Sequence, residues 1–391
     1  MAASSERSAG GEPAKSNLHV LIMAGGTGTR FWPKSRSTRP KQLLALWDEK
    51  TLLQHTIDRF APLVKHARVW IVTTESLVEF SRNALGGAYS EVRVLAEPEG
   101  KNTAPCILWG ITEIAKVDPE ATIAVMPADH YIGDEDAFLE SVGTAVTEAR
   151  ERGGLVTLGI RPDRPETGYG YIETDGGHAP EHAPEHAPGH APGHAPRGAP
   201  TKTSTTAQMG AILVKQFVEK PDLRTALRYI ESGSYLWNAG MFIFTARAGL
   251  NAFEACMPEL TAVFARNAPI DVKKTYAEIR PEDAVSIDYG VMESAASKGI
   301  RVAVVPASCG WNDVGSFTAL EDINRSVQGE VVTHDCNSNV VQTDAGFVAL
   351  LGVNDLVVVR DREVVLVAAK DRAQDVKKLL EKVRAKFPSS V

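Results

Sequence analysis

The stretch LHVLIMAGGTGTR, residues 18–30, joins a short apolar run to a cluster of glycines. The run Leu18–Ala24 is rich in branched side chains and ends at the glycines, which predicts a buried strand that feeds a loop. Gly25, Gly26 and Gly28 would let backbone N–H groups approach a phosphate closely, because no Cβ stands in the way. The loop is neither a Walker A motif nor a GxGxxG motif, so it implies neither of those folds. A tight structural turn is the alternative interpretation.

Five basic residues follow the glycines within twelve positions: Arg30, Lys34, Arg36, Arg39 and Lys41. An even spread of the chain's 42 Lys and Arg over 391 positions would place about one of them there. The chain as a whole carries a formal net charge of −7. This argues against nucleic acid as a partner, because such binding surfaces gather phosphate contacts over a whole face. One basic loop suits a small polyphosphate better, although a solvated charge run is the alternative.

Length and composition set broad limits on the architecture. The 391 residues allow one large domain or two ordinary ones, and 43% hydrophobic residues suffice for a core. The cysteines lie far apart without metal-ligand spacing, as expected for reduced thiols: Cys106, Cys256, Cys309 and Cys336. Residues 1–17 are polar and lack the apolar core of a signal peptide, and no apolar run reaches membrane-spanning length. We therefore expect a cytoplasmic protein with a disordered tail over residues 1–17 and no membrane partner.

Strand and helix patterns alternate through the first 160 residues. Apolar runs at 18–24, 68–74, 91–97, 121–130 and 154–160 alternate with helical spacing around 53–64, 103–115 and 136–150. Such alternation predicts right-handed crossovers and a mostly parallel sheet that is covered on both faces. Ligands in such folds bind beyond the carboxyl ends of the strands. The glycine loop and the motif PADH, residues 127–130, both follow strand patterns, so we expect them to share one edge of the sheet.

A repeat interrupts the pattern between residues 175 and 208. The histidines recur every fourth position, at His178, His182, His186, His190 and His194. Proline in every repeat excludes a helix, and the segment has little to bury. We interpret it as a flexible surface insertion between two strands, with a metal-binding tract as the alternative.

The sequence pattern changes again at about residue 329, where short strands and turns replace the alternation of strands and helices. The strand patterns are NSNVVQTDAG, FVALLGV, DLVVVRD and EVVLVAA, in that order. A final amphipathic helix is predicted with Val376, Leu379, Leu380 and Val383 on one face. The predicted division is therefore a large α/β domain over 18–328 and a small β-rich domain with a terminal helix over 329–391.

The motifs together resemble a known family. The segment GGTGTRFWPKS…RPKQ is similar to the signature GGxGTRxxP…PK of the sugar-1-phosphate nucleotidylyltransferases. Further motifs occur in the order found in mannose-1-phosphate guanylyltransferases (GDP-mannose pyrophosphorylases): EPEGKNTAPC, MPADH, TGYGYIE, FVEKP, WNAGMF, SIDYGVME and WNDVGSF. The resemblance covers residues 18–325, apart from the histidine-rich insertion. The C-terminal region is similar to that of short monofunctional members, so we expect the cupin-like isomerase domain of the long members to be missing.

The resemblance implies a Rossmann-like (GT-A-like) nucleotidyltransferase domain of the α/β class and a defined reaction. GTP and α-D-mannose 1-phosphate would give GDP-mannose and pyrophosphate. The attacking sugar-phosphate oxygen is already ionised near neutral pH, so catalysis reduces to aligning two polyanions and neutralising charge on the leaving pyrophosphate. One alternative is a related enzyme for another hexose 1-phosphate or nucleoside triphosphate. The other is a non-catalytic, nucleotide-sugar-binding regulatory subunit, which we would expect to lack the loop Arg, the Lys or a metal-binding Asp.

By resemblance, the catalytic residues are Arg30, Lys41, Asp129 and Asp313, with Lys41 closing over the nucleotide phosphates. Both aspartates are assigned to Mg²⁺, which prefers oxygen ligands and usually takes one or two carboxylates plus phosphates. Their alternatives are a helix N-cap for Asp129 and a turn residue for Asp313. His130 is expected to support Asp129 rather than to bind the metal.

The resemblance also assigns the substrate contacts. The resemblance implies that the nucleotide phosphates are bound by the loop residues Ala24, Gly25, Gly26, Gly28, Thr29 and Arg30. It implies that guanine is recognised by Asn102, in a pocket shaped by Pro98, Thr103 and Ala104. It implies that the sugar 1-phosphate is bound by Gly168, Glu173, Lys220, Asn238 and Asp288. Trp237 and Phe242 are expected in the core, and a homodimer through the C-terminal region or a sheet edge is plausible.

Overall fold

The structure is a computed structural model that describes residues 17–26, 28–175 and 210–387. The predicted tail, except for its last residue, and the predicted insertion, except for Asp175, lie outside the described residues. All four cysteines lie inside the described part and are free. No helix in these described ranges is both long and apolar enough to cross a membrane.

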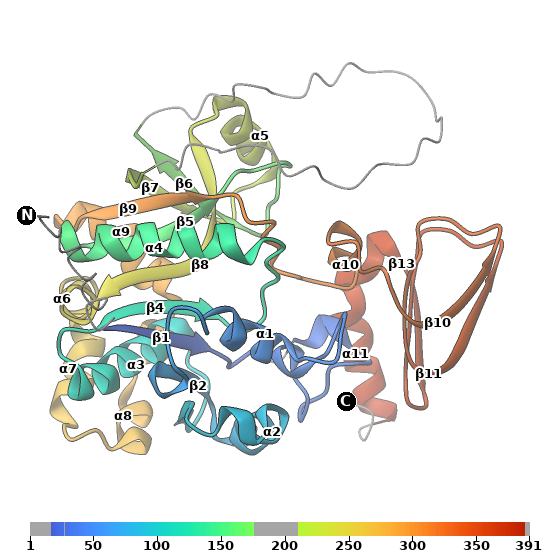
Figure 1. Cartoon of the computed structure of the whole chain (residues 1–391), viewed down its shortest axis with the longest axis horizontal. Coiled ribbons are helices and arrows are strands. Elements are labelled where there is room, and N and C mark those ends of the chain that lie inside the picture. The colour runs from blue at the N-terminus through green and yellow to red at the C-terminus, as the bar shows by residue number, and fades with distance from the viewer. Residues whose placement is uncertain (1–16, 27, 176–209, 388–391) are drawn as a thin grey trace, which may run out of the picture.

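The large domain is built on one sheet of nine strands in the order β3-β2-β1-β4-β8-β5-β9-β7-β6 (Figure 1). The bounds are β1 Leu18–Met23, β2 Val69–Thr74, β3 Arg93–Glu97, β4 Thr122–Pro127, β5 Leu155–Ile160, β6 Gly170–Thr174, β7 Ile212–Glu219, β8 Tyr235–Thr245 and β9 Val302–Ala307. The pairings make β7 and β8 run against the other seven strands. Seven of the nine strands thus share one direction, as predicted, although five of the nine strand pairs are antiparallel.

Helices cover both faces of this sheet. The helices of the described residues are α1 Leu52–Arg59, α2 Glu75–Leu85, α3 Thr103–Val117, α4 Glu135–Glu151, α5 Leu223–Ser232, α6 Ala246–Cys256, α7 Pro258–Arg266, α8 Val272–Glu278, α9 Glu293–Ala295, α10 Ala319–Asp322 and α11 Val376–Lys386. Of these, α10 and α11 pack in a separate cluster with the C-terminal strands. Leu21 of β1 packs in the core beneath α3, α6 and α7, whereas Val20 and Ile22 pack in the core beneath α1 and α4. Successive side chains of a strand point to opposite faces, so a run such as LHVLIM is apolar at almost every position to fill both cores. Its one polar residue, His19, is buried and hydrogen-bonded to Asp118 and Trp70.

Local signals explain where the helices begin. Thr51 and Gln54 form a reciprocal capping box at the start of α1, a feature that stabilises a helix by about 1 kcal/mol. The Asp134 side chain caps α4 by accepting from Ala137 N, and the Asp222 side chain caps α5 in the same way.

The C-terminal domain is a four-stranded sheet followed by α11 (Figure 1). Its strands are β10 Val327–His334, β11 Val340–Leu351, β12 Leu356–Asp361 and β13 Val364–Ala369, with parallel β10/β11/β12 and antiparallel β12/β13. The sequence patterns missed β10 and divided β11 in two at Gly346. That division is wrong, because Val340–Leu351 is one strand; its register with β10 shifts near Gly346, which takes a positive φ of 61°, and pairing resumes at Phe347.

The terminal helix is confirmed but its predicted buried face is partly wrong. Val376 and Leu380 are buried, whereas Leu379 is 42% exposed. Buried Val376 and Leu380 and partly buried Val383 follow the i, i+4, i+7 spacing of one narrow stripe, and Leu379 lies to one side of it.

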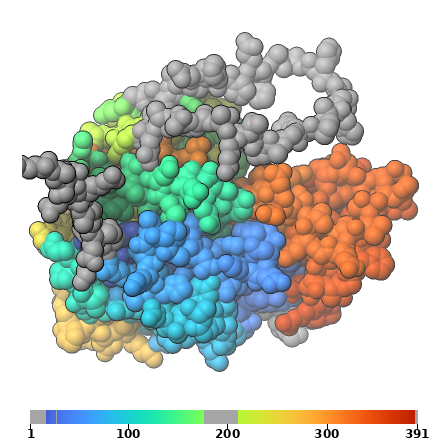
Figure 2. Space-filling view, viewed as in Figure 1, coloured from blue at the N-terminus to red at the C-terminus, as the bar shows by residue number. Residues whose placement is uncertain are grey.

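A third core cluster joins the two domains. Phe31, Leu44 and Leu46, which follow the glycine loop, share it with Val357 and Val359 of β12 and with residues of α11. Figure 2 shows the C-terminal domain in orange and red against the blue N-terminal segments. The two domains therefore pack along the segment that carries the basic residues.

Candidate functional site

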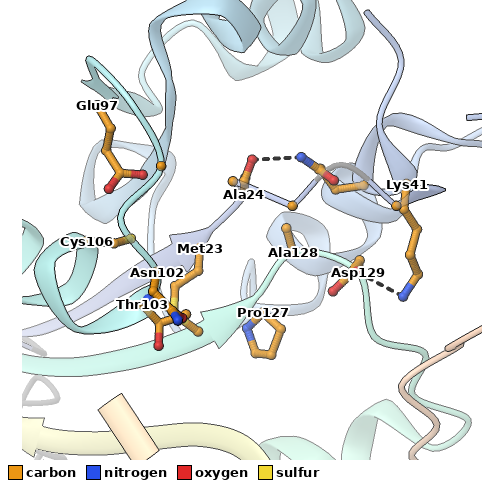
Figure 3. A pocket seen from close by; sticks show the side chains of 15 residues that line it. Met23, Ala24, Lys41, Glu97, Asn102, Thr103, Cys106, Pro127, Ala128 and Asp129 are labelled. Carbon is orange, nitrogen blue, oxygen red and sulfur yellow. Dashed lines mark hydrogen bonds and ion pairs between the residues drawn. The ribbon is translucent and has the colours of Figure 1, made fainter. Parts of the chain in front are cut away.

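The carboxyl ends of β1, β3 and β4 open into a cavity of about 340 Å³ (Figure 3). Small-molecule pockets usually measure roughly 300 to 1,000 Å³, so this one is large enough for a substantial part of a nucleotide. Its lining residues are Met23, Ala24, Gly25, Gly26, Gly28, Lys41, Gln42, Glu97, Gly100, Asn102, Thr103, Cys106, Pro127, Ala128 and Asp129. The expectation that the glycine loop and PADH share one edge of the sheet is confirmed.

The glycine loop is shaped by one residue that must be glycine and by two that leave space. Gly28 has a φ of 60°, and a Cβ there would lie 2.3 Å from the Cβ of Lys41. Gly26 has no neighbouring atom within 4 Å of a built Cβ, and Gly25 has only a Glu97 carboxylate oxygen at 3.8 Å. Ala24 is anchored through its carbonyl, which accepts from Gln42 Nε2 at 2.7 Å and from Thr73 Oγ1 at 2.9 Å. The loop backbone thus lies open to the cavity above a fixed base.

Lys41 connects the two predicted metal-binding aspartates. Its Nζ lies 2.9 Å from Asp129 Oδ2 and donates to the carbonyl of Asp313 at 2.7 Å. The lysine side chain is 9% exposed. Burial acts to raise the pKa of Asp129, but the Lys41 charge, the neighbouring His130 and the hydrogen bond hold that pKa below its ordinary value. The structure therefore brings Lys41, Asp129 and Asp313 together although 272 positions separate Lys41 from Asp313.

A second, smaller cavity of about 170 Å³ lies on the Asp313 side of Lys41. Its lining residues are His130, Gly168, Tyr169, Gly170, Glu219, Asn238, Ala239, Gly240, Asp288, Trp311 and Asp313. The Tyr169 hydroxyl donates to Asp313 Oδ1 at 2.6 Å, and Trp311 Nε1 donates to His130 Nδ1 at 3.1 Å. Burial, followed by the charge of Asp313, raises the pKa of Tyr169, so the phenol stays protonated and serves as a donor.

Polar side chains on β7, β8 and the helical turn at Asp288–Met292 form the far wall of the second cavity. Asn238 Nδ2 donates to Asp288 Oδ1 at 2.7 Å. Burial and the nearby Glu219 raise the pKa of Asp288. A Cβ on Gly170 would lie 2.6 Å from Glu219 Oε2, so a larger residue there would displace the end of that carboxylate side chain. These groups can exchange hydrogen bonds with several hydroxyls of one small molecule.

Several residues assigned by resemblance lie outside both linings. Arg30 is exposed and donates to Gln374 Oε1 at 3.1 Å, in the segment before α11. Glu173 lies in β6, paired with Gln216 of β7 and with Tyr235 of β8. Lys220 is next to the second cavity through its ion pair with Glu219 at 2.6 Å. Thr29, Pro98 and Ala104 also lie outside the linings.

The first turn of α3 is largely used for capping. Asn102 has a φ of 67°, and its side-chain oxygen accepts from Thr103 N at 2.9 Å. Thr103 Oγ1 accepts from Ile287 N at 2.9 Å, and Ala104 N donates to Val285 O at 3.0 Å. Asn102 and Thr103 still line the first cavity.

Glu97 is the residue that sequence reasoning missed in the first cavity. It ends β3, is 3% exposed and accepts from the Tyr276 hydroxyl at 2.8 Å. Burial raises the pKa of Glu97 to about 7, although the hydrogen bond from Tyr276 acts to lower it. A buried carboxyl that titrates near neutrality is typical of binding and catalytic sites. The only sequence signal was its place at the end of a strand, directly before Pro98.

The oxygen groups around Lys41 suit a divalent cation with few protein ligands. No cluster of three or more His, Cys, Asp or Glu side chains that could hold a metal occurs in the described ranges. The Asp129 carboxylate and the Asp313 backbone carbonyl both contact the Lys41 ammonium group, so oxygen atoms of the two residues already surround one positive charge. Two carboxylates completed by substrate phosphates and water match the usual coordination of Mg²⁺.

Comparison with known proteins covers both domains. The family described as Nucleotidyl transferase matches residues 19–330, and a family described as MannoseP isomerase/GMP-like beta-helix domain matches residues 329–383. A mannose-1-phosphate guanylyltransferase of Escherichia coli K12 is 36% identical over 386 residues, which are 95% of this chain and 74% of that protein. The xanthan biosynthesis protein XanB of Xanthomonas campestris pv. campestris is 35% identical, with 95% of this chain and 74% of that protein covered.

A solved structure resembles this one over almost its whole length. The crystal structure of a protein described as mannose-1-phosphate geranyltransferase, from Thermus thermophilus, is 35% identical in sequence with a TM-score of 0.78. The match covers 94% of this chain and 99% of that chain. Both domains and their relative arrangement are therefore shared with that protein.

Proposed function

Because the chain belongs to the nucleotidyl transferase family and, within it, to the group of the mannose-1-phosphate guanylyltransferases, we propose that it makes GDP-mannose. GMP is transferred from GTP to α-D-mannose 1-phosphate, and pyrophosphate leaves. The observation that carries the proposal is the position of Lys41. Its ammonium group joins Asp129, at the larger cavity, to Asp313, at the smaller one. Two anionic substrates held in these cavities would meet at that group.

The larger cavity suits GTP. The open backbone at Gly25 and Gly26 would receive the phosphates, and Lys41 would neutralise them. Guanine presents two adjacent donors, N1–H and the 2-amino group, next to the acceptor O6. The Glu97 carboxylate can accept from the donors and the Asn102 side-chain amide can donate to O6. Adenine lacks the N1–H donor, so Glu97 would favour guanine.

The smaller cavity suits the hexose phosphate. Glu219, Asn238 and Asp288 would bind sugar hydroxyls, and Lys220 would approach the sugar phosphate from its place beside Glu219. A sugar phosphate oriented in this way attacks the α-phosphorus with an oxygen that is already ionised. The chain's part is then to hold both reactants in line and to offset charge on the leaving pyrophosphate.

Asp129 and Asp313 would hold the cation, for which we propose Mg²⁺. When bound, it supplies Lewis-acid neutralisation of the phosphate oxygens. Tyr169 keeps one Asp313 oxygen oriented through its 2.6 Å hydrogen bond, and His130 lies 4.0 Å from Asp129. Retention of Lys41 and both aspartates in one cluster argues against a non-catalytic regulatory subunit.

We further propose a homodimer formed through the C-terminal domain, and a cytoplasmic location. Val332, Phe347 and Leu351 are 62%, 67% and 73% exposed. The register pairs Glu330 with Phe347 and His334 with Leu351, so the three apolar side chains share one face of the β10–β11 pair. Exposed apolar side chains that gather on one face, here with Glu330 and His334 at their border, are typical of a protein interface.

A substrate panel tests the proposed reaction. The purified chain is supplied with Mg²⁺, each of the common nucleoside triphosphates and each of several hexose 1-phosphates, and pyrophosphate release is measured. We expect the highest kcat/KM with GTP and mannose 1-phosphate. Faster turnover with another pair of substrates would assign the chain to that pair. If no pair gave pyrophosphate, the proposed enzymatic activity would be refuted. Asp129→Asn serves as the inactive control.

A further inference from the structure

The basic residues that follow the glycine loop are directed mainly at the C-terminal domain. Arg36 Nη2 and Arg39 Nη2 both reach the Asp361 carboxylate, at 3.3 and 2.6 Å. Lys34 Nζ donates to Gln328 Oε1 of β10 at 2.5 Å. Arg30 also reaches this domain through Gln374, whereas Lys41 turns to Asp129. The run of positive charge is thus mostly an interdomain contact.

Asp361 is placed as a buried anchor for this contact. Its side chain is 4% exposed, at the end of β12 where Asp361 pairs with Val364 of β13. Two guanidinium groups on one buried carboxylate form charge-assisted hydrogen bonds, which are shorter and stronger than neutral ones. Loss of such an acid would leave two partly buried cations without their counter-charge.

The segment held by Asp361 leads directly to Lys41. Arg36 and Arg39 pair with each other through reciprocal backbone hydrogen bonds of 2.9 and 3.0 Å, and Arg39 Nε donates to Lys34 O at 2.9 Å. This closes residues 34–39 into one compact turn. Buried Pro40 follows the turn, and Lys41 starts the next short helix. A displacement of the turn would therefore displace the lysine.

The core beneath the turn supports the opposite side of the site as well. Phe31 and Leu44 flank the turn and pack in one cluster with Val357 and Val359 of β12. Val314 and Phe317, which follow Asp313, belong to the same cluster. The C-terminal domain is thus packed beneath both segments that meet at the Lys41 ammonium group.

We propose that Asp361 is a positioning residue for nucleotidyl transfer, which sets the place of Lys41 through Arg36 and Arg39. The expected fall in kcat rests on the proposed function. The expected anchoring of the turn by Asp361 rests only on the contacts between the two domains. The C-terminal domain is then part of the catalytic unit, and Arg36 and Arg39 are occupied by protein rather than by phosphate.

The test uses Asp361→Asn in the full chain. The matched control is Asp344→Asn in the same domain, where the carboxylate accepts from Arg362 N and lies 4.0 Å from Arg360. We expect Asp361→Asn to lower kcat roughly tenfold, because a displacement of about 1 Å in a positioned group can cost up to a hundredfold. KM for mannose 1-phosphate should stay within about twofold, and the control should keep the wild-type kcat. Wild-type kinetics in folded Asp361→Asn, or an equal loss in the control, would overturn the proposal.

A second variant keeps the test decisive if Asp361→Asn does not fold. Arg39→Gln removes the 2.6 Å contact from the loop side, where the arginine side chain is 37% exposed. It should lower kcat in the same way, and the double variant should lose no more than Asp361→Asn alone. Additive losses in the double variant, or wild-type kcat in Arg39→Gln, would show that the two residues do not act together.

A proteolytic readout separates this inference from the proposed reaction. Trypsin must take an arginine side chain into its specificity pocket, and Arg36 is paired with Asp361 and 15% exposed. We expect Asp361→Asn to speed cleavage after Arg36 at least several-fold, with no change in the Asp344→Asn control. This holds whether or not the chain turns over GTP. Unchanged cleavage would contradict the anchor even in an active enzyme.

Discussion

Glu97 offers the most quantitative test of the larger cavity. Burial raises its pKa from the ordinary 4.5 to about 7, so the folded chain binds this proton more tightly than the unfolded chain does. The contribution to stability is therefore complete below about pH 4.5 and is lost as the pH rises to about 7. A shift of this size corresponds to about 3 kcal/mol. Glu97→Gln mimics the protonated carboxyl, keeps an acceptor for Tyr276 and removes the titration.

The measurement is the free energy of unfolding by urea at pH 4.5 and at pH 8, for wild type, Glu97→Gln and Glu99→Gln. Glu99 belongs to the same segment and its side chain is 62% exposed. We expect the free energy of unfolding of Glu97→Gln, relative to wild type, to be about 3 kcal/mol higher at pH 8 than at pH 4.5. The difference between Glu99→Gln and wild type should not change with pH. A constant difference between Glu97→Gln and wild type across this range would refute the argument. The same variant should also bind GTP more weakly, because an amide presents a donor where guanine needs an acceptor.

Four further predictions address the rest of the site. Asp313→Ala should lower Mg²⁺-dependent kcat by roughly a hundredfold or more, measured as pyrophosphate release, because a charge-stabilising group at the reacting phosphate is lost. Lys220→Ala should raise KM for mannose 1-phosphate roughly tenfold with kcat nearly unchanged, as expected for loss of one charged hydrogen bond; a fall in kcat alone would contradict its binding role. Phe347→Asp should convert the proposed homodimer to monomers in light scattering, and a wild-type mass would exclude this face. Deletion of residues 177–200 should leave turnover within a few-fold, whereas near-complete loss would place that segment in the site.

The sheet could be predicted from the sequence because burial on both faces requires a run that is apolar at almost every position. LHVLIM and TIAVMP satisfy two cores at once, and this pattern is visible without any knowledge of neighbouring strands. The C-terminal strands were harder to predict. Val340–Leu351 carries exposed residues over much of its second half, so no periodic pattern distinguishes one long strand from two short ones.

The candidate site could be predicted where chemistry is concentrated in a short motif, and not where it depends on distant partners. The glycine loop and Asp129 lie in motifs that follow strands, so their place at one edge could be inferred. Glu97 acquires its character from burial and from Tyr276, which is 179 positions away. Tyr169 acquires its role from Asp313, 144 positions away. Pairings of this range leave no trace in local spacing.

The basic loop shows that a charge count overestimates how many cations are free to bind a ligand. Its five cations predicted a grip on polyphosphate, yet Arg36 and Arg39 are satisfied by Asp361 across 325 and 322 positions. A small anion needs few well-placed cations, because each added positive charge must be desolvated along with the ligand. Using the other cations to fix the loop against a second domain keeps Lys41 in one position between Asp129 and Asp313. That arrangement lowers the reorganisation required when two anionic substrates meet, which is the condition under which electrostatic stabilisation is most effective.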